Sequence, residues 1–133
     1  MVGLHVDQTD PTPPYEQLRR QLVVLIEAGT LREGARLPPV RQLAADLALA
    51  TGTVARTYRE LEKAGLVRSR RGAGTAVTPG KQVLTDAARR ERIRVLARGA
   101  VQQSRLMGAS DEEIRQAIDL ALRQPEATST AQS

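Results

Sequence analysis

The sequence of 133 residues contains no cysteine, no tryptophan and no phenylalanine, and it has only one histidine and two tyrosines. Without cysteine the chain forms neither disulfides nor thiolate metal sites, and it has no thiol nucleophile. The single histidine, His5, excludes any site that needs two imidazoles. The carboxylates are scattered along the chain rather than grouped for acid and base chemistry. We therefore expect no catalytic residue, no metal ligand and no cofactor.

Long hydrophobic runs are also missing. The longest run, Leu22 to Ile26, is far shorter than the ~20 residues that a membrane-spanning helix needs. The N-terminus MVGLHVDQTD is acidic where a secretory signal would be basic. These features predict a cytoplasmic protein that has no membrane partner. At this length we expect one small domain with an accessory segment.

Positive charge is concentrated in the middle of the chain. Lysine and arginine number 20 against 15 acidic residues, which gives a net charge of +5, and 18 of the 20 are arginine. The net charge is +6 over residues 34–81 and +4 over 82–106, whereas both ends are net acidic. No acidic residue occurs between Lys63 and Thr85. This pattern is typical of a surface that meets phosphates, although a solvated basic face without a function gives the same pattern.

Apolar residues recur at helical spacing in three segments of the first half of the chain. The first predicted helix begins at Pro14 and stops at Gly29, and a second, short helix starts at Pro38 and Pro39. A third helix has Thr51 as its expected N-cap and ends at Gly65. Their inward stripes are Leu18, Leu22, Leu25 and Ile26 for the first, Val40, Leu43, Ala44 and Leu47 for the second, and Val54, Tyr58 and Leu61 for the third.

Two short β-type runs follow, over residues 66–69 and 75–78, and the loop between them contains Gly72 and Gly74. Such an arrangement predicts a β-hairpin. Residues 30–37 show no sustained period and are expected to form a loop. The order of helix, loop, short helix, tight connection, helix and hairpin is that of a winged helix-turn-helix. We therefore predict a mainly α fold with a small β-hairpin, in which residues 1–80 form a winged helix-turn-helix DNA-binding domain.

After Pro79 and Gly80 the sequence predicts only helices, one over residues 83–107 and one that begins at Ser110. Two helices are too few to enclose a ligand cavity of ~300 Å³, so no built-in metabolite pocket is expected within one subunit, and the sequence leaves a small-molecule effector unknown. We expect residues 81–124 to form a two-helix homodimerisation region and residues 125–133 a disordered tail. Alternatively, the helices fold back on their own winged domain. The expected dimerisation residues are Ile93, Leu96, Ala97, Ala100, Val101, Ile114, Ile118 and Leu122.

Small and hydrogen-bonding residues gather on the outer face of the third helix, where its N-terminal end would enter a major groove. Arg56 can fork onto a guanine edge or hold a phosphate, and Arg41 lies in the first turn of the second helix. At the hairpin tip, Arg70 and Arg71 would face the minor groove or its phosphates. Arg59 either contacts DNA or pairs with a carboxylate such as Glu62. The predicted DNA-binding residues are Arg41, Thr51, Gly52, Thr53, Arg56, Arg70, Arg71 and Gly72.

The run LPPVRQLAADLALATGTVARTYRELEKAGLVRSRRGAGTAV, residues 37–77, resembles the DNA-binding domain of the GntR family of bacterial transcription regulators. The resemblance implies phosphate contacts from Arg41, base readout from residues 51–53 and Arg56, and minor-groove or phosphate contacts from Arg71 and Gly72. The sequence has Ala48 and Ala50 where the family usually has a turn Gly and a capping Ser or Asn. The Val-Ala-Arg-Thr-Tyr run and the short C-terminal region look like the YtrA subfamily.

YtrA-like proteins have no large effector domain and are often encoded with ATP-binding-cassette transporters. The resemblance therefore implies a repressor of a transport operon. The expected two-fold dimer would bind a pseudo-palindromic operator in double-stranded DNA. Two other interpretations stay open. One is a winged-helix domain used for RNA or protein contacts, and the other is the front end of a longer, aminotransferase-fused regulator, against which the polar end of the sequence argues.

Overall fold

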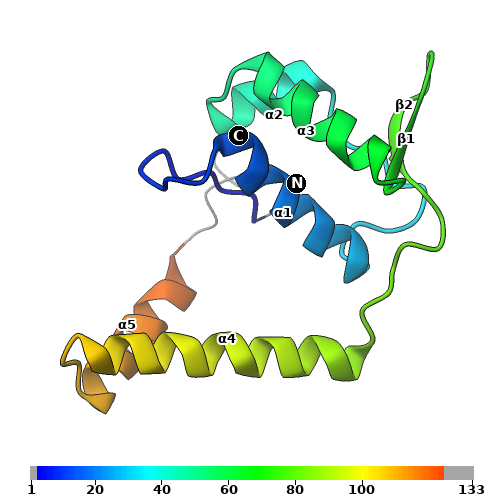
Figure 1. The fold of residues 1–133 in the computed structure, drawn as a ribbon. Helices are drawn as coiled ribbons and strands as arrows, with labels where there is room; N and C mark the ends of the chain where they lie inside the picture. Colours follow the sequence, from blue (N-terminus) through cyan, green and yellow to red (C-terminus); the bar gives the residue numbers. More distant parts are fainter. Residues whose placement is uncertain (1–2, 125–133) are drawn as a thin grey trace. The chain divides into compact units, whose positions relative to one another are not determined.

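The computed structural model describes residues 3–124, which divide into two compact units, 3–84 and 85–124 (Figure 1). The first unit contains α1 (Pro14–Glu27), α2 (Val40–Leu47), α3 (Thr51–Lys63), β1 (Val67–Arg70) and β2 (Gly74–Val77). The second unit contains α4 (Asp86–Leu106) and α5 (Asp111–Arg123). The predicted winged helix-turn-helix order and the two C-terminal helices are thus confirmed. The expected disordered tail, 125–133, lies outside the described residues.

The core of the first unit forms where α1 crosses α3. Leu18, Leu22 and Ile26 of α1 are buried, and so are Val54 and Leu61 of α3. Burial of these stripes holds α1 and α3 together, because each short helix alone is marginal in water. The predicted inward faces are therefore confirmed for both helices.

Tyr58 points into this core, as expected, and its hydroxyl donates a hydrogen bond of 2.6 Å to the carbonyl oxygen of Pro38. Burial raises the pKa of the Tyr58 phenol well above its usual value. The bond ties α3 to the segment that leads into α2. Tyr58 therefore serves the packing of the helices and not a surface for stacking bases.

The N-terminal boundaries of three helices differ from prediction. Helix α4 begins at Asp86 instead of residue 83, because Thr85 is its N-cap. Helix α2 begins at Val40, with Pro39 as the N-cap, so the two prolines precede the helix instead of forming its first turn. Thr51 is the first residue of α3 and Ala50 is its N-cap. The prediction that Thr51 caps this helix was therefore wrong. The alanine at the cap has no side-chain acceptor, so no side-chain hydrogen bond closes this helix end.

The hairpin is joined by a third extended segment that the sequence did not reveal. Strands β1 and β2 pair antiparallel, with Val67 opposite Val77, and they are shifted by about one residue from the predicted runs. Arg36 forms a bridge with Ala76 on the other edge of β2. Two backbone hydrogen bonds hold this segment in place. The Leu37 amide donates one of 2.8 Å to the carbonyl oxygen of Thr75, and the Val77 amide donates one of 2.9 Å to the carbonyl oxygen of Ala35. The predicted loop 30–37 was therefore partly wrong, because its end extends the sheet.

The turn between α2 and α3 contains a residue in the left-handed backbone conformation. Ala48 has φ 56° and ψ 44°, and it is the one non-glycine residue with positive φ among residues 3–124. A Cβ in this conformation costs about 1–2 kcal/mol. Here the departure from the family pattern noted in the sequence has a structural cost.

We expect Ala48→Gly to raise the free energy of unfolding by about 0.5–1 kcal/mol, because relief of strain exceeds the entropy that glycine adds to the unfolded chain. Urea unfolding followed by circular dichroism measures it. Ala45→Gly is the matched control, since Ala45 lies inside α2 and should lose about 0.5–1 kcal/mol. Equal destabilisation by both variants would contradict the strain at Ala48.

Side-chain caps begin both helices of the second unit. The Thr85 hydroxyl accepts a hydrogen bond of 3.1 Å from the amide of Ala88, and the Ser110 hydroxyl accepts one of 3.1 Å from the amide of Glu113. The helix predicted to begin at Ser110 thus has this residue as its N-cap. Ile114 is the one buried apolar side chain of these helices, whereas Leu96 is 73% and Leu122 is 79% exposed. Within residues 3–124, no helix is apolar and long enough to cross a bilayer.

Candidate nucleic-acid interface

The first turn of α3 offers polar groups to a partner. Thr51 and Gly52 are exposed and Thr53 is half-buried. The amides of Thr51 and Gly52 have no intrahelical acceptor, whereas the Thr53 amide donates a hydrogen bond of 3.1 Å to the carbonyl oxygen of Ala50. The alanine at the N-cap provides no acceptor from its side chain. The Thr51 and Gly52 amides, the two threonine hydroxyls and the close approach allowed by Gly52 make this end suited to a phosphate or a base edge.

Arg56 is placed by a ring on another helix. Its guanidinium carbon lies 3.7 Å from the centre of the Tyr15 ring, in a cation–π stack between α3 and the start of α1. The Arg56 residue is exposed, so the stack leaves part of the guanidinium accessible. An arginine that stacks on one face keeps its planar N–H fork free to donate along its edge. Tyr15 thereby joins the candidate site, a role that no motif or period in the sequence predicts.

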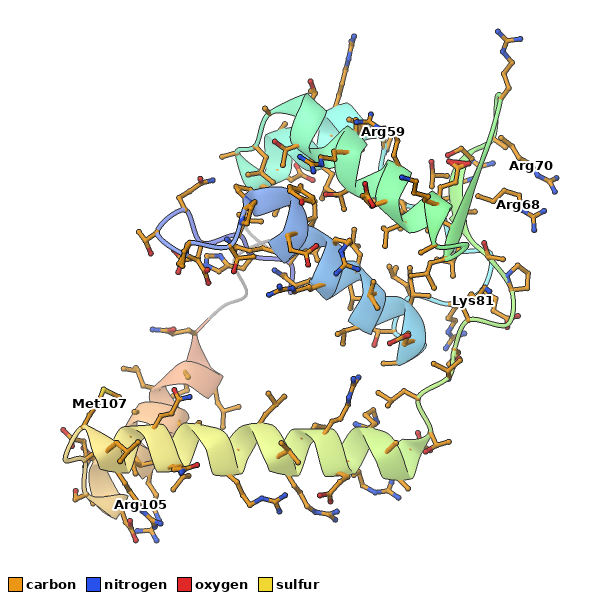
Figure 2. The ribbon with its side chains drawn as sticks, in the orientation of Figure 1. Arg59, Arg68, Arg70, Lys81, Arg105 and Met107 are labelled. Atoms are coloured by element: carbon orange, nitrogen blue, oxygen red, sulfur yellow. The ribbon has the colours of Figure 1, made fainter. Side chains whose placement is uncertain are left out.

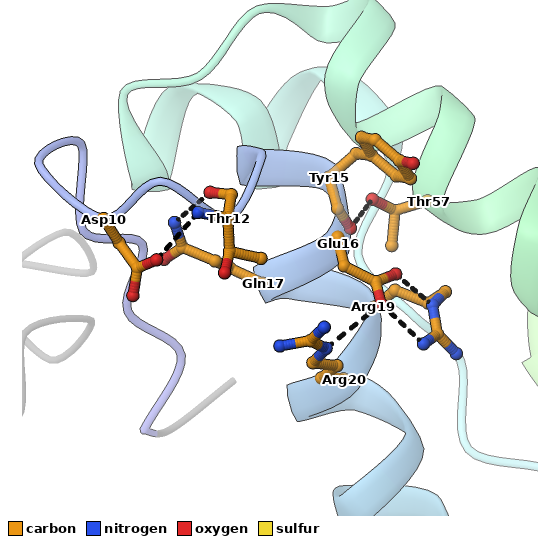
Figure 3. A network of polar contacts seen from close by, with 8 residues as sticks. All are labelled: Asp10, Thr12, Tyr15, Glu16, Gln17, Arg19, Arg20 and Thr57. Atoms are coloured by element: carbon orange, nitrogen blue, oxygen red, sulfur yellow. Dashed lines mark hydrogen bonds and ion pairs between the residues drawn. The ribbon is translucent and has the colours of Figure 1, made fainter.

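The backbone of Tyr15 is fixed independently of its ring. The Thr57 hydroxyl donates a hydrogen bond of 3.1 Å to the carbonyl oxygen of Tyr15, and Thr57 is fully buried (Figure 3). The same hydroxyl lies 3.1 Å from the carbonyl oxygen of Thr53. The start of α1 is therefore tied to the helix that carries Arg56, so the backbone that carries the Tyr15 ring is held in place.

On α1, two arginines are neutralised by a carboxylate of the same helix. Glu16 binds Arg19 through two hydrogen bonds and Arg20 through one of 3.0 Å (Figure 3). The bond from Arg19, with a smaller contribution from Arg20, lowers the pKa of the Glu16 carboxyl to about 2. Arg19 and Arg20 are thus held by a carboxylate on their own helix. They differ in this respect from the arginines predicted to contact DNA.

Arg41 is the second residue of α2 and is exposed. It takes part in none of the ion pairs found among residues 3–124. The helix N-terminus beneath it adds a partial positive charge. Arg59 on α3 is also exposed and also makes no ion pair among residues 3–124. It does not pair with Glu62, because the Glu62 carboxylate accepts a hydrogen bond of 3.4 Å from the Ser69 amide. Arg41 and Arg59 are therefore available to an anionic partner.

The hairpin presents its arginines at the far end from the core. Arg70 is the last residue of β1, opposite Gly74, and Arg71 and Gly72 form the turn with Ala73. Gly72 and Gly74 have φ of +80° and +76°, which a side chain would disfavour. Arg70 and Arg71 are both exposed and unpaired in the described part of the chain. Figure 2 shows the Arg70 side chain extending from the hairpin.

No group of three or more His, Asp and Glu side chains that could hold a metal ion occurs within residues 3–124. The features assembled instead are a helix with an open first turn, a stacked arginine and a basic wing. The class of protein that this fold defines is the winged helix-turn-helix class, whose members bind DNA with surfaces of this kind.

Comparison with known proteins gives the family. The model described as "Bacterial regulatory proteins, gntR family" matches residues 14–77. The uncharacterized HTH-type transcriptional regulator YhcF of Bacillus subtilis is 32% identical over 106 residues, which cover 80% of this chain and 87% of that protein. The chain belongs to the gntR family of bacterial regulatory proteins and contains the DNA-binding domain of that family.

Further relatives confirm the YtrA-like character. The HTH-type transcriptional regulator Rv1152 of Mycobacterium tuberculosis is 47% identical and the repressor YtrA of Bacillus subtilis is 36% identical, each over 75 residues or 56% of this chain. The matches span only 62% and 58% of these two proteins. The structure of YtrA from Sulfolobus acidocaldarius is similar over 90% of this chain and 96% of that one, with a TM-score of 0.55 and 26% identity.

Proposed function

We propose that the chain is a homodimeric repressor that binds a pseudo-palindromic operator and controls a transport operon that includes its own gene. The observation that carries the DNA-binding part is the combination of the open first turn of α3 with arginines that no carboxylate neutralises. Each half-site would receive the start of α3 in its major groove and the tip of the hairpin in the adjacent minor groove. The repressor role is supported by the name of the Bacillus subtilis relative, YtrA.

The proposed roles of the residues follow from their positions. The first turn of α3, residues 51–53, and Arg56 would read base edges, because they occupy the end of the helix that enters the groove. Arg41 would bind a backbone phosphate from the start of α2. At the hairpin tip, Arg70, Arg71 and Gly72 would contact the minor groove or its phosphates.

The homodimer is proposed from the second unit. The apolar residues predicted to dimerise lie on α4 and α5, and most of them are exposed, with Ile93 at 52% and Ile118 at 43%. Exposed apolar stripes on paired helices are suited to covering by a second copy. A two-fold dimer would place two recognition helices on half-sites about one helical turn apart.

Selection of bound duplexes from random DNA tests the specific-regulator proposal. We expect one pseudo-palindrome to be enriched, and the same sequence to occur upstream of the gene itself. The affinity for that duplex should fall steeply as salt rises, and should exceed the affinity for a scrambled duplex of equal length. Equal binding of the palindromic and scrambled duplexes, or tighter binding of single-stranded RNA, would contradict the proposal.

A further inference from the structure

We propose that the outer face of the hairpin carries a phosphate-binding hollow formed by Arg36, Arg68 and Arg70. The hollow would take a phosphate group, either from the DNA backbone beside the half-site or from a free phosphorylated compound. The DNA alternative rests on the function proposed above, whereas the capacity to bind phosphate does not. Neither Arg36 nor Arg68 was predicted as a site residue from the sequence.

The register of the strands brings the three arginines together. Arg68 lies opposite Ala76 on β2, and Arg36 bridges the same Ala76 from the other edge. Residues directly opposite one another in neighbouring strands have their side chains on the same face of the sheet. Arg70 follows Arg68 by two residues and therefore shares that face. Figure 2 shows Arg68 and Arg70 on one side of the hairpin.

Spacing permits all three side chains to reach one ligand. Neighbouring strands are about 4.8 Å apart, so Arg36 and Arg68, which flank β2, lie roughly 10 Å apart along the sheet. Arg68 and Arg70 are separated by about 7 Å along β1. An extended arginine side chain covers such distances, and guanidinium forks from three directions suit the tetrahedral oxygens of phosphate.

The opposite face of the hairpin packs against the core at the end that contains Val67 and Val77. Val67 and Val77 are buried against the core of the first unit, and the hydroxyls of Ser69 and Thr75 lie 2.9 Å apart. The arginine face is thus the solvent-facing one. On it lies a hollow of about 300 Å³, whose remaining lining consists mainly of small residues such as Gly34, Gly74 and Ala76. Small side chains in the floor leave room for a ligand beneath the arginines.

The charges in the hollow are not balanced by the protein. None of its three arginines makes an ion pair among residues 3–124, in contrast to Arg19, which binds Glu16. The nearest acidic neighbour in the sequence, Glu33, accepts a hydrogen bond of 2.8 Å from the Gly80 amide and is engaged there. Three positive groups on one small face repel one another, and an anion bound between them would relieve this repulsion.

Thermal unfolding of the full chain without DNA tests the hollow directly, with inorganic pyrophosphate as the probe and chloride at equal ionic strength as the reference. A ligand that binds only the folded state raises the melting temperature. We expect pyrophosphate to raise it for the parent, and Arg36→Gln and Arg68→Gln each to remove most of that shift. Arg32→Gln makes the same charge change outside the hollow and should retain the shift.

Two duplexes separate the sources of the phosphate. Both carry the selected operator, and one ends at the operator boundary while the other has flanking base pairs. If the phosphate belongs to DNA, Arg36→Gln and Arg68→Gln will each weaken binding of the flanked duplex several-fold. The slope of log affinity against log salt concentration will fall by about one, and base preference will stay unchanged. If it belongs to a free compound, the pyrophosphate shift will appear and both duplexes will bind the variants and the parent equally.

The proposal is overturned if both variants match the parent in the pyrophosphate shift and on both duplexes. This failure differs from failure of the proposed function. A parent that binds the palindromic and scrambled duplexes equally would refute specific regulation, and the melting experiment would still decide whether the hollow binds phosphate.

Discussion

Arg56→Ala is expected to lower the affinity for the selected operator by about 10- to 100-fold and to flatten the preference for that sequence. The reason is that a bidentate arginine contact with a base edge contributes about 1–3 kcal/mol of discrimination. Quantitative binding to the operator and to a panel of single-base variants measures both effects. Arg56→Lys keeps the charge but loses the fork, so it should retain more affinity than sequence preference.

The stack on Tyr15 makes a separate prediction possible for the same site. Tyr15→Leu should weaken operator binding about 2- to 5-fold, because an exposed cation–π contact contributes about 0.5–1 kcal/mol to holding the arginine in place. Tyr15→Phe preserves the ring face and should bind like the parent. The hydrogen bond from Thr57 goes to the backbone of Tyr15, so neither substitution removes it. A loss in Tyr15→Phe equal to that in Tyr15→Leu would contradict the stack as the cause.

Arg41→Ala is the matched control for a contact with phosphate. It should weaken binding of all duplexes by a similar factor and lower the salt slope by about one, without changing base preference. If Arg56→Ala showed this uniform pattern instead, Arg56 would be a phosphate contact. If Arg41→Ala and Arg56→Ala both bound like the parent, the proposed groove-facing surface would be wrong.

Helices whose apolar residues repeat with a helical period were predictable from the sequence. The stripes of α1 and α3 are buried as expected, and the cap at Ser110 forms. Such features depend on neighbours within four residues, which a single sequence contains. Helix ends were less predictable, since Thr51 has a better capping side chain than Ala50 and the chain still uses Ala50 as the N-cap. Tertiary packing decides the boundary there.

Contacts between segments far apart in the sequence could not be predicted from periodic patterns or from near neighbours in the chain. The bridge between Arg36 and Ala76 joins residues far apart in sequence, and nothing in the composition of residues 30–37 indicates a strand. The stack of Arg56 on Tyr15 is likewise tertiary. An aromatic residue at the start of a helix gives no period and no motif by which its partner on another helix could be identified. These two contacts define the hollow and the placement of Arg56.

These contacts separate the arginines of the charge pattern into unpaired ones and ones neutralised by a carboxylate. The basic segment 34–81 contains arginines in different settings, because unpaired Arg41 lies at the start of α2, on a surface proposed to contact DNA, while the sheet register places Arg36 on one face of the hairpin with Arg68 and Arg70. Arg19 and Arg20, in the acidic N-terminal part, are held by Glu16. Net charge alone could not separate free from neutralised arginines, since that distinction depends on which carboxylates the fold brings near.

The second large effect is expected from Leu96→Asp on α4. Leu96 is 73% exposed and belongs to the stripe proposed to contact a second copy. A carboxylate there would have to be desolvated in the dimer without a partner, which disfavours association. We expect the parent to sediment with twice the mass of one chain and the variant with the mass of one.

Loss of the dimer should lower affinity for the full palindrome about 100-fold or more, because the second half-site no longer binds at high effective concentration. Affinity for a duplex with a single half-site should stay unchanged, which separates dimer loss from damage to the winged unit. Val95→Asp is the matched control. Val95 is 51% exposed and, at 3.6 residues per turn, lies on the far side of α4 from Ile93. A dimer that persists in Leu96→Asp, or is lost equally in Val95→Asp, would show that the predicted stripe is not the interface.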